Sequence, residues 1–438
     1  MKKKVLCLFL VTVMVLSLAA CGAKETTPTP QAAEPVTGTP EVTEPVSTPT
    51  PDPTETPTPT PDNAWYDEMI ARSLITTGNN YRLRKVIEKA QSGEDVYIGF
   101  IGGSITEGEG TSYENCYAMQ TYKMFSEMYG KGDNVHIINA GVSGTPSTLG
   151  VIRYERDLIE KNDGHLPDLL IIEFAVNDGD DPTNGQTYEG LIRRALYADN
   201  EPAVVLLFSV FRSKWNLQDR CKPIGAHYNL PMVSIKDAVV PCLNSGKITN
   251  SQFFNDEYHP KLYGHTIMAR CLANLFKAAM EAEPSAADTP KKDAFKSSAF
   301  DNVHMITSKS TNVKVTAGSF SGVDAAIGTT RYDKAKTFPD NWKHEVNAGN
   351  KALTFTVKAK TILLTYKKSS SQDFGSADVF VDGKKVTTIN GYDKGGWNNP
   401  YTAVILNTDT VASHKVEVKM AEGNEDKLFT VMAFGYGE

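Results

Sequence analysis

An acid and an imidazole lie three positions apart in the segment Asp256-Glu257-Tyr258-His259-Pro260. Pro260 disfavours helical geometry for the residue before it and suits the first position of a helix, so we expect His259 on a loop at a helix entrance. There the Asp256 carboxylate can hold one imidazole nitrogen while the other nitrogen faces a nucleophile. On its own, an Asp-x-x-His pair is more often structural. A metal site is disfavoured, because these residues have no further clustered ligands.

Seven other histidines compete for the role of general base, and none of them follows an Asp at this spacing on a loop that enters a helix: His136, His165, His227, His265, His304, His344 and His414. His265 follows His259 by about a turn and a half of the expected helix. We expect it to be packed or exposed rather than catalytic.

Three further polar segments follow apolar runs: Gly102-Gly103-Ser104-Ile105-Thr106, Asn139-Ala140-Gly141-Val142-Ser143-Gly144 and Ala175-Val176-Asn177-Asp178. The carboxyl ends of parallel strands meet at one edge of a sheet, so these side chains should converge. A hydroxyl at Ser104 could attack a carbonyl, and the neutral amide of Asn177 could stabilise the resulting oxyanion. Taken alone, Gly-Gly-Ser fits an ordinary turn with Ser104 as a helix cap. A phosphate loop is disfavoured, because no Gly-Lys-Ser/Thr follows.

The elements that must position these residues alternate between strand and helix patterns. Apolar runs predict strands at 96–101, 135–138, 169–176, 203–210 and 232–235, and helical spacing predicts helices at 117–129, 149–161, 186–197 and 262–282. Continuous apolar strands between helices are typical of a parallel sheet covered on both faces. Residues 63–284 are therefore predicted to form a three-layer α/β/α domain with about five strands. Glu173 interrupts one run, and we expect a structural carboxyl with a hydrogen-bond partner or, as an alternative, a substrate contact.

The pattern changes once along the folded part. Residues 285–299 are rich in Ala, Ser, Lys and Asp and predict a linker. In residues 300–438 helix patterns vanish, and short strands are predicted at 352–357, 361–366, 377–381, 385–389, 402–406, 415–419 and 429–434. Asp382-Gly383 between two of them is a hairpin signal. We expect an all-β sandwich or jelly roll.

The blocks GGSIT, NAGVSG, AVND and DEYHP, in this order and spacing, resemble the SGNH/GDSL hydrolase superfamily over roughly residues 80–280. This resemblance implies Ser104 as nucleophile, His259 as general base and Asp256 as its orienting carboxylate. It implies an oxyanion hole made of the Ser104 and Gly144 amides with the Asn177 side chain. Gly103 departs from the usual Gly-Asp-Ser, and we expect activity to be kept with a change in the stability of the loop.

The GGSIT turn, the AVND block and a C-terminal β domain are similar to bacterial carbohydrate esterases of this superfamily, which remove acetyl groups from polysaccharides such as xylan or mannan. The resemblance implies an acetylated polysaccharide or oligosaccharide substrate and no metal or organic cofactor. Trp397, Tyr392 and Tyr401 of a Gly-rich loop are candidates for sugar stacking, or they pack in the sandwich core. Two alternatives stay open: a lipase-like or aryl-ester hydrolase with the same triad, and a non-catalytic glycan-binding surface lipoprotein.

The first 21 residues predict export. Three lysines precede a short apolar run, and the ending Leu-Ala-Ala-Cys resembles the bacterial lipobox, which implies a lipid anchor at Cys21. Residues 22–62 hold 11 of the 23 prolines and no aromatic residue, so we expect a disordered Thr/Pro-rich tether. Together they predict the outer face of a cell membrane as the location.

The remaining composition excludes other classes of protein. A net charge of -7 and no polybasic patch argue against a nucleic-acid partner. Cys116, Cys221, Cys242 and Cys271 show no metal-binding spacing, and free buried thiols are at least as consistent with the sequence as disulfides.

Overall fold

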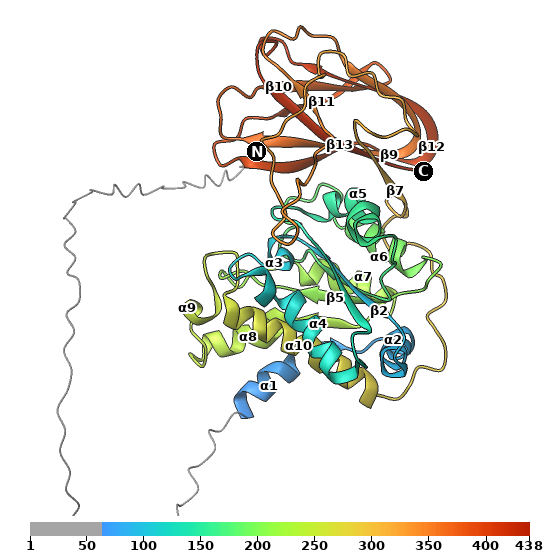
Figure 1. Ribbon diagram of the computed structural model, residues 1–438, viewed down its shortest axis with the longest axis vertical. Coiled ribbons are helices and arrows are strands. Elements are labelled where there is room, and N and C mark those ends of the chain that lie inside the picture. Colours follow the sequence, from blue (N-terminus) through green and yellow to red (C-terminus); the bar gives the residue numbers. More distant parts are fainter. Residues whose placement is uncertain (1–63) are drawn as a thin grey trace, which may run out of the picture. The chain divides into compact units, whose positions relative to one another are not determined.

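The computed structural model describes residues 64–438 (Figure 1). The expected signal 1–21 with Cys21 and the expected tether 22–62 lie outside the described residues and stay predictions. The described residues belong to one unit. It holds an α/β domain followed along the chain by a β domain.

The sheet of the α/β domain has six strands in the order β1-β6-β5-β4-β2-β3. The strands are β1 (Leu74–Thr76), β2 (Val96–Gly102), β3 (Val135–Gly141), β4 (Leu169–Glu173), β5 (Ala203–Phe208) and β6 (Met232–Ser234). All pairs are parallel except β1 with β6. The predicted parallel α/β architecture is confirmed, and a short antiparallel edge strand is added to it.

Helices cover both faces of this sheet. They are α1 (Ala64–Arg72), α2 (Tyr81–Ser92), α3 (Ser104–Glu107), α4 (Tyr117–Tyr129), α5 (Ser147–Leu158), α6 (Gln186–Leu196), α7 (Gln218–His227), α8 (Ile235–Asn244), α9 (Asn250–Phe253) and α10 (Leu262–Glu281), with 3-10 turns η1 (Tyr113–Asn115) and η2 (Glu160–Asn162). Neighbouring strand residues such as Phe100 and Ile101 enter separate apolar cores. Burial on both faces explains why the strands appear as continuous apolar runs.

Several predicted boundaries differ from the structure: the strand expected at 203–210 ends at Phe208, and the strand expected at 135–138 extends to Gly141. Two further differences have local reasons. The strand expected to reach Val176 ends at Glu173, because the chain turns there: the backbone N–H of Asn177 donates to the backbone carbonyl of Phe174 at 3.0 Å. The helix expected to reach Lys161 ends at Leu158 and continues as the separate turn η2.

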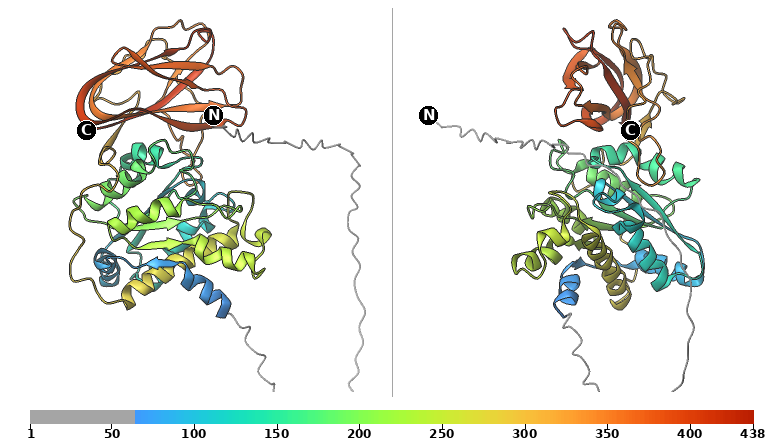
Figure 2. Two further views of the ribbon diagram at one scale, coloured as in Figure 1. Left: turned by 180° about the vertical axis from the view of Figure 1, so that it is seen from behind. Right: turned by 60° about the vertical axis from the view of Figure 1, so that its left-hand side comes forward.

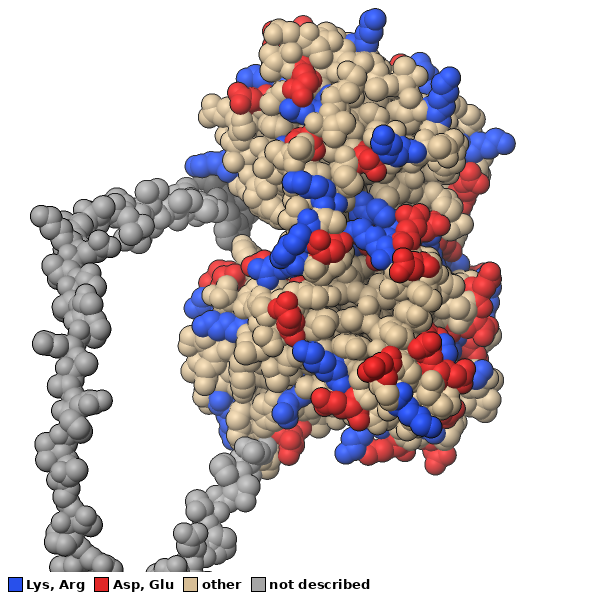
Figure 3. All heavy atoms as spheres, viewed as in Figure 1, with Lys and Arg blue, Asp and Glu red and all other residues tan. Residues whose placement is uncertain are grey.

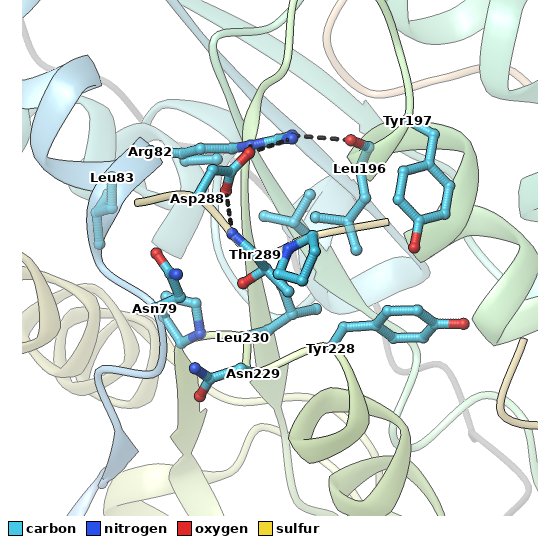
Figure 4. A pocket seen from close by; sticks show the side chains of 14 residues that line it. Asn79, Arg82, Leu83, Leu196, Tyr197, Tyr228, Asn229, Leu230, Asp288 and Thr289 are labelled. Atoms are coloured by element: carbon cyan, nitrogen blue, oxygen red, sulfur yellow. Dashed lines mark hydrogen bonds and ion pairs between the residues drawn. The ribbon is translucent and has the colours of Figure 1, made fainter. Parts of the chain in front are cut away.

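The segment predicted as a linker is irregular but packed against the α/β domain. Arg82 of α2 pairs with Asp288 at 2.6 Å and donates to the Leu196 carbonyl at 2.8 Å (Figure 4). The carboxyl group of Glu189 accepts hydrogen bonds from the amides of Phe295, Lys296 and Ser297. The cavity lined in part by residues 288–290 of this segment has a volume of about 30 Å³, which is enough for a water molecule but not for a substrate.

All pairs of named strands in the β domain are antiparallel, with strand order β11-β10-β12-β9-β13-β7 and β8 paired to β13. Its strands are β7 (Val303–Ile306), β8 (Trp342–His344), β9 (Leu353–Ser369), β10 (Ser376–Val381), β11 (Lys384–Asn390), β12 (Trp397–Met420) and β13 (Phe429–Gly437). Figure 2 shows these strands as strongly curved. Their buried side chains form an apolar core within the β domain, as in a β-sandwich. The expected fold class is confirmed.

The long strands β9 and β12 each contain two of the predicted short strands. Polar residues interrupt the apolar pattern in β12, where the pairing with β9 shifts register between Asn407 and Ala412. Asp382 and Gly383 both have positive φ, 52° and 77°, so the predicted hairpin turn is confirmed. Figure 3 shows acidic and basic side chains intermixed on the face in view.

Candidate active site

Ser104 stands where β2 passes into the short helix α3. The turn depends on Gly102, because a Cβ there would lie 2.7 Å from the carbonyl oxygen of Glu173 and would also meet the Thr106 side chain. Gly103 is crowded from the other side, since its Cβ would lie 2.5 Å from Nδ2 of Asn177. As the first residue of α3, Ser104 has an amide with no acceptor inside the helix.

The loop that presents His259 is held in shape by its own backbone. The Asn255 amide donates to the His259 carbonyl at 2.8 Å, and Phe254 forms an isolated bridge with Pro260. Helix α10 begins shortly afterwards at Leu262. His259 therefore lies on a loop at a helix entrance, the position that Pro260 predicted.

Ser104, His259 and Asp256 form a hydrogen-bonded chain. Nε2 of His259 lies 2.9 Å from Oγ of Ser104, and Nδ1 lies 2.9 and 3.0 Å from the two carboxylate oxygens of Asp256. Because a carboxylate only accepts, Nδ1 carries a proton and Nε2 keeps its lone pair for the Ser104 hydroxyl. This is the arrangement of a nucleophile with an oriented general base.

Asp256 is built to stay charged. Partial burial opposes its ionisation, but hydrogen bonds from the His259 ring and from the amides of Tyr258 and His259 lower the pKa of Asp256 to about 2. An ionised Asp256 fixes the tautomer of His259 and favours the imidazolium that forms when Ser104 loses its proton.

The three residues expected to form the oxyanion hole, Ser104, Gly144 and Asn177, lie together at one cavity. Gly144 has φ of +70°, and Gly144, Asn177 and Ser104 line one cavity of about 500 Å³. The carbonyl oxygen of Asn177 is the buried atom of its amide and has no hydrogen-bond partner, which leaves Nδ2 for the cavity. The structure thus brings together the predicted donors, and their role in catalysis stays a prediction.

Glu107 and Arg331 belong to the site and were missed from the sequence. One carboxyl oxygen of Glu107 accepts from the amide of Ser143 at 2.7 Å and from its hydroxyl at 2.5 Å, and the other accepts from the Arg331 amide at 2.8 Å. The Arg331 guanidinium donates to the carbonyls of Gly108 and Thr111. Glu107 therefore connects the loop next to Gly144 to Arg331 of the β domain. No local sequence pattern predicts this connection.

His265 is structural. It is buried, accepts from the Tyr117 amide at Nδ1 and contacts the Glu109 carbonyl through Nε2 at 3.1 Å. Burial lowers the pKa of His265 to about 4, so the ring is neutral and pins the segment after Ser104 to α10.

The β domain supplies one wall of the cavity through Trp397, Thr329 and Arg331. Trp397 lies against Gly144, whose Cβ would come 2.8 Å from the indole ring. Trp397 is 53% exposed and Tyr401 45% exposed, so neither is packed in the sandwich core. Tyr392 and Tyr401 do not line this cavity; Tyr401 meets the ring of Tyr366 edge-on at 5.7 Å.

Glu173 was expected to have a hydrogen-bond partner or to contact substrate, and the structure shows neither. Its carboxyl group is fully buried at the end of β4, and neither oxygen has a hydrogen-bond partner, although Ser209 lies close by. Burial raises the pKa of Glu173 to about 8, so the group is protonated at neutral pH. Since it does not line the cavity, it does not contact substrate there.

Within residues 64–438, no cluster of three or more His, Cys, Asp or Glu side chains could hold a metal ion. In the same part of the chain, no helix has the length and apolar character needed to cross a membrane. Cys116, Cys221, Cys242 and Cys271 are free and buried.

Residues 100–267 match the GDSL-like lipase/acylhydrolase family. This stretch holds Ser104, Asn177 and the Asp256–His259 pair, and it confirms the resemblance to SGNH/GDSL hydrolases that the four sequence blocks carried. The protein is a serine hydrolase that acts on carboxylic esters.

The solved structures extend the likeness to both domains. A two-domain esterase (CEX) active on acetylated mannans, co-crystallised with mannopentaose, is 29% identical and has a TM-score of 0.72, covering 84% of this chain and 98% of its own. A second structure of a two-domain esterase (CEX) active on acetylated mannans has 27% identity and a TM-score of 0.74, covering 84% and 99%. Among curated proteins, none matches the sequence.

Proposed function

We propose that this protein removes O-acetyl groups from a polysaccharide of the mannan or xylan type. The observation that carries the proposal is the Ser104–His259–Asp256 chain opening into a cavity of about 500 Å³ that is also walled by Trp397 of the β domain. The two-domain esterases active on acetylated mannans share this domain arrangement and support mannan as the first substrate to test.

The reaction follows from the contacts. Oγ of Ser104 attacks the acetyl carbonyl while Nε2 of His259 takes the hydroxyl proton, and the carbonyl oxygen becomes an oxyanion facing the amides of Ser104 and Gly144 and Nδ2 of Asn177. Collapse breaks the bond to the sugar oxygen, which receives the proton from His259 and leaves as a hydroxyl. Water, activated by His259, then hydrolyses the acetyl-Ser104 ester and releases acetate.

The size of the acyl group follows from Trp397. Its indole lies against Gly144, one of the expected oxyanion donors, and we expect the acyl group to sit beside it. A short acyl group such as acetyl fits beside that ring, whereas a long chain would have to displace it. We expect activity on model esters to fall steeply as the acyl chain lengthens; a preference for long chains would favour the lipase-like alternative.

A panel of acetylated mannans, xylans and pectins, with acetate release as readout, tests the substrate class. Release from mannan or xylan supports the proposal, and release only from small aryl esters contradicts it. Labelling of Ser104 by an active-serine phosphonate separates the enzyme from a non-catalytic glycan-binding protein, which would not react.

The proposed location is the outer face of the cell membrane, with Cys21 as the lipid anchor. The lipobox-like ending before Cys21 and the Thr/Pro-rich stretch 22–62 support it, because a tethered enzyme suits a polymeric substrate outside the cell. Membrane fractionation of the full-length protein and of Cys21→Ser tests it: the variant should be released, and equal retention of both would contradict the anchor.

A further inference from the structure

Aromatic side chains from two loops form the wall of the cavity next to His259. Phe211 and Tyr258 line the cavity together with His259. The ring of Phe211 meets Tyr258 edge-on at 5.1 Å between centroids and stacks with Trp215 at 5.7 Å. Trp215 lies outside the cavity lining and extends this surface through its contact with Phe211; the three rings of Phe211, Trp215 and Tyr258 are here called the aromatic wall.

The outer rings of the aromatic wall are open to solvent. Trp215 is 40% exposed and Tyr258 is 56% exposed. Large aromatic rings gain much stability from burial, so a contiguous exposed group of them marks an interaction surface. Trp215 reaches back over Gly179, whose Cβ would lie 3.4 Å from the indole, so the surface stays close to the Asn177–Asp178 turn.

The two loops that carry the aromatic wall are fastened to each other. The Arg212 amide donates to the Glu257 carbonyl at 3.1 Å, and the side chains of the same two residues form an ion pair at 3.0 Å. The Phe211 amide donates to the Trp215 carbonyl at 3.1 Å, which closes the turn between them. The wall is therefore held in place beside the catalytic loop before any ligand arrives, which lowers the entropy cost of binding.

The deacetylation reaction indicates which part of the substrate, the sugar or the acyl group, would contact the aromatic wall. His259 must give its proton to the sugar oxygen as that oxygen leaves, so the sugar sits on the His259 side of Ser104. The acyl group and its oxyanion sit on the side of Gly144 and Asn177. Tyr258 is the chain neighbour of His259, and Phe211 lines the cavity with it, so this end of the aromatic wall is in the path of the polymer.

We propose that the aromatic wall binds pyranose units adjacent to the acetylated sugar, so that Trp215 and Tyr258 select polymer over isolated acetylated sugars. The inference rests on the proposed deacetylation of polysaccharide. Pyranose rings carry faces of C–H groups, and the electron-rich faces of aromatic rings attract such positively polarised hydrogens. The exposed Arg212 and Glu257 at the rim offer polar groups to sugar hydroxyls.

The test compares kcat/KM on an acetylated polymer with kcat/KM on an acetylated monosaccharide, for the full-length wild type and for Trp215→Ala, Tyr258→Ala and Trp215→Phe. We expect the polymer-to-monosaccharide ratio to fall about tenfold in both alanine variants, mainly through KM on the polymer, and to be largely kept in Trp215→Phe. Phe295→Ala is the matched control, because Phe295 is an aromatic residue with 46% exposure whose ring lies against His227 and not against the aromatic wall.

The outcomes separate this inference from the proposed function. Wild-type activity on the monosaccharide but none on any polymer overturns the proposed polysaccharide substrate. Polymer activity with an unchanged ratio in the alanine variants overturns the aromatic wall alone. Equal losses on both substrates would assign these rings to positioning His259, and a changed acyl-chain preference without a changed ratio would assign them to the acyl group; either result contradicts sugar binding.

Discussion

Nε2 of His259 lies 2.9 Å from Oγ of Ser104, although 155 positions separate the two residues. Their meeting depends on a close approach of two backbones. Gly110 has φ of +90°, and a Cβ there would lie 3.2 Å from the Cβ of His259 and would also strike the Pro260 carbonyl. The loop after Ser104 can therefore rest directly on the His259 loop only because residue 110 has no side chain.

Asp256→Asn should lower kcat by roughly 10²–10⁴-fold with a modest change in KM, because an amide cannot stabilise the imidazolium and can hold the wrong tautomer. The low pKa of Asp256, about 2, means that the wild-type carboxylate stays ionised throughout the mildly acidic range. Steady-state kinetics on acetylated mannan measures the effect. The exposed Asp409→Asn serves as control, and an equal rate in both variants would remove Asp256 from the mechanism.

Glu107→Gln should lower kcat on the order of tenfold, because an amide cannot accept from both Ser143 and the Arg331 backbone, and the Gly144 loop then loses its support. KM should change little, since Glu107 acts through the loop. Glu345→Gln is the control: it removes a partly exposed ion pair with Lys343 outside the cavity, and such pairs contribute little. Similar kinetics for both variants would contradict the positioning role of Glu107.

Restoring the Gly-Asp-Ser pattern with Gly103→Asp should impair the enzyme. The new Cβ would come 2.5 Å from Nδ2 of Asn177 and displace this oxyanion donor, whose loss costs roughly 10²–10³-fold in kcat. Gly103→Ala should behave alike, because the clash begins at Cβ. Full activity of either variant, measured on a small acetate ester, would show that Asn177 is not needed where the structure places it.

Much of this site follows from the sequence, because continuous apolar runs reveal a parallel sheet and a parallel sheet brings its strand ends together. Ser104 and Asn177 could therefore be predicted to converge, and Pro260 predicted a loop at a helix entrance for His259. Arg331 could not: it lies 224 positions from Glu107, in a stretch without regular secondary structure, so periodicity carries no signal there. The packing of segment 285–299 against the α/β domain could not be predicted either. Its contact with Glu189 uses backbone amides, and amino-acid composition gives no information about those.

The sequence also could not predict that the buried carboxyl of Glu173 lacks a hydrogen-bond partner, because the surroundings of a buried side chain are set by the folded state. Its pKa rises from 4.5 to about 8 on folding, so the native state holds a proton that the unfolded chain releases. The free energy of unfolding therefore falls by on the order of a few kcal/mol as the pH rises from 4.5 to about 8, and it levels off above that range.

Glu173→Gln should flatten this slope, because glutamine does not titrate. Urea unfolding across the same pH window measures it. A residual slope should remain from Asp178, whose pKa burial raises to about 7. Identical pH profiles for wild type and Glu173→Gln would show that Glu173 is ionised in the native protein.

We propose that Ser104 accepts an acetyl group from a polysaccharide. Acetate release from acetylated mannan, measured side by side for the full-length wild type and Ser104→Ala, tests it most directly. We predict steady release by the wild type and a loss of several orders of magnitude in the variant, with its fold intact by circular dichroism. Equal release by both proteins would contradict the account.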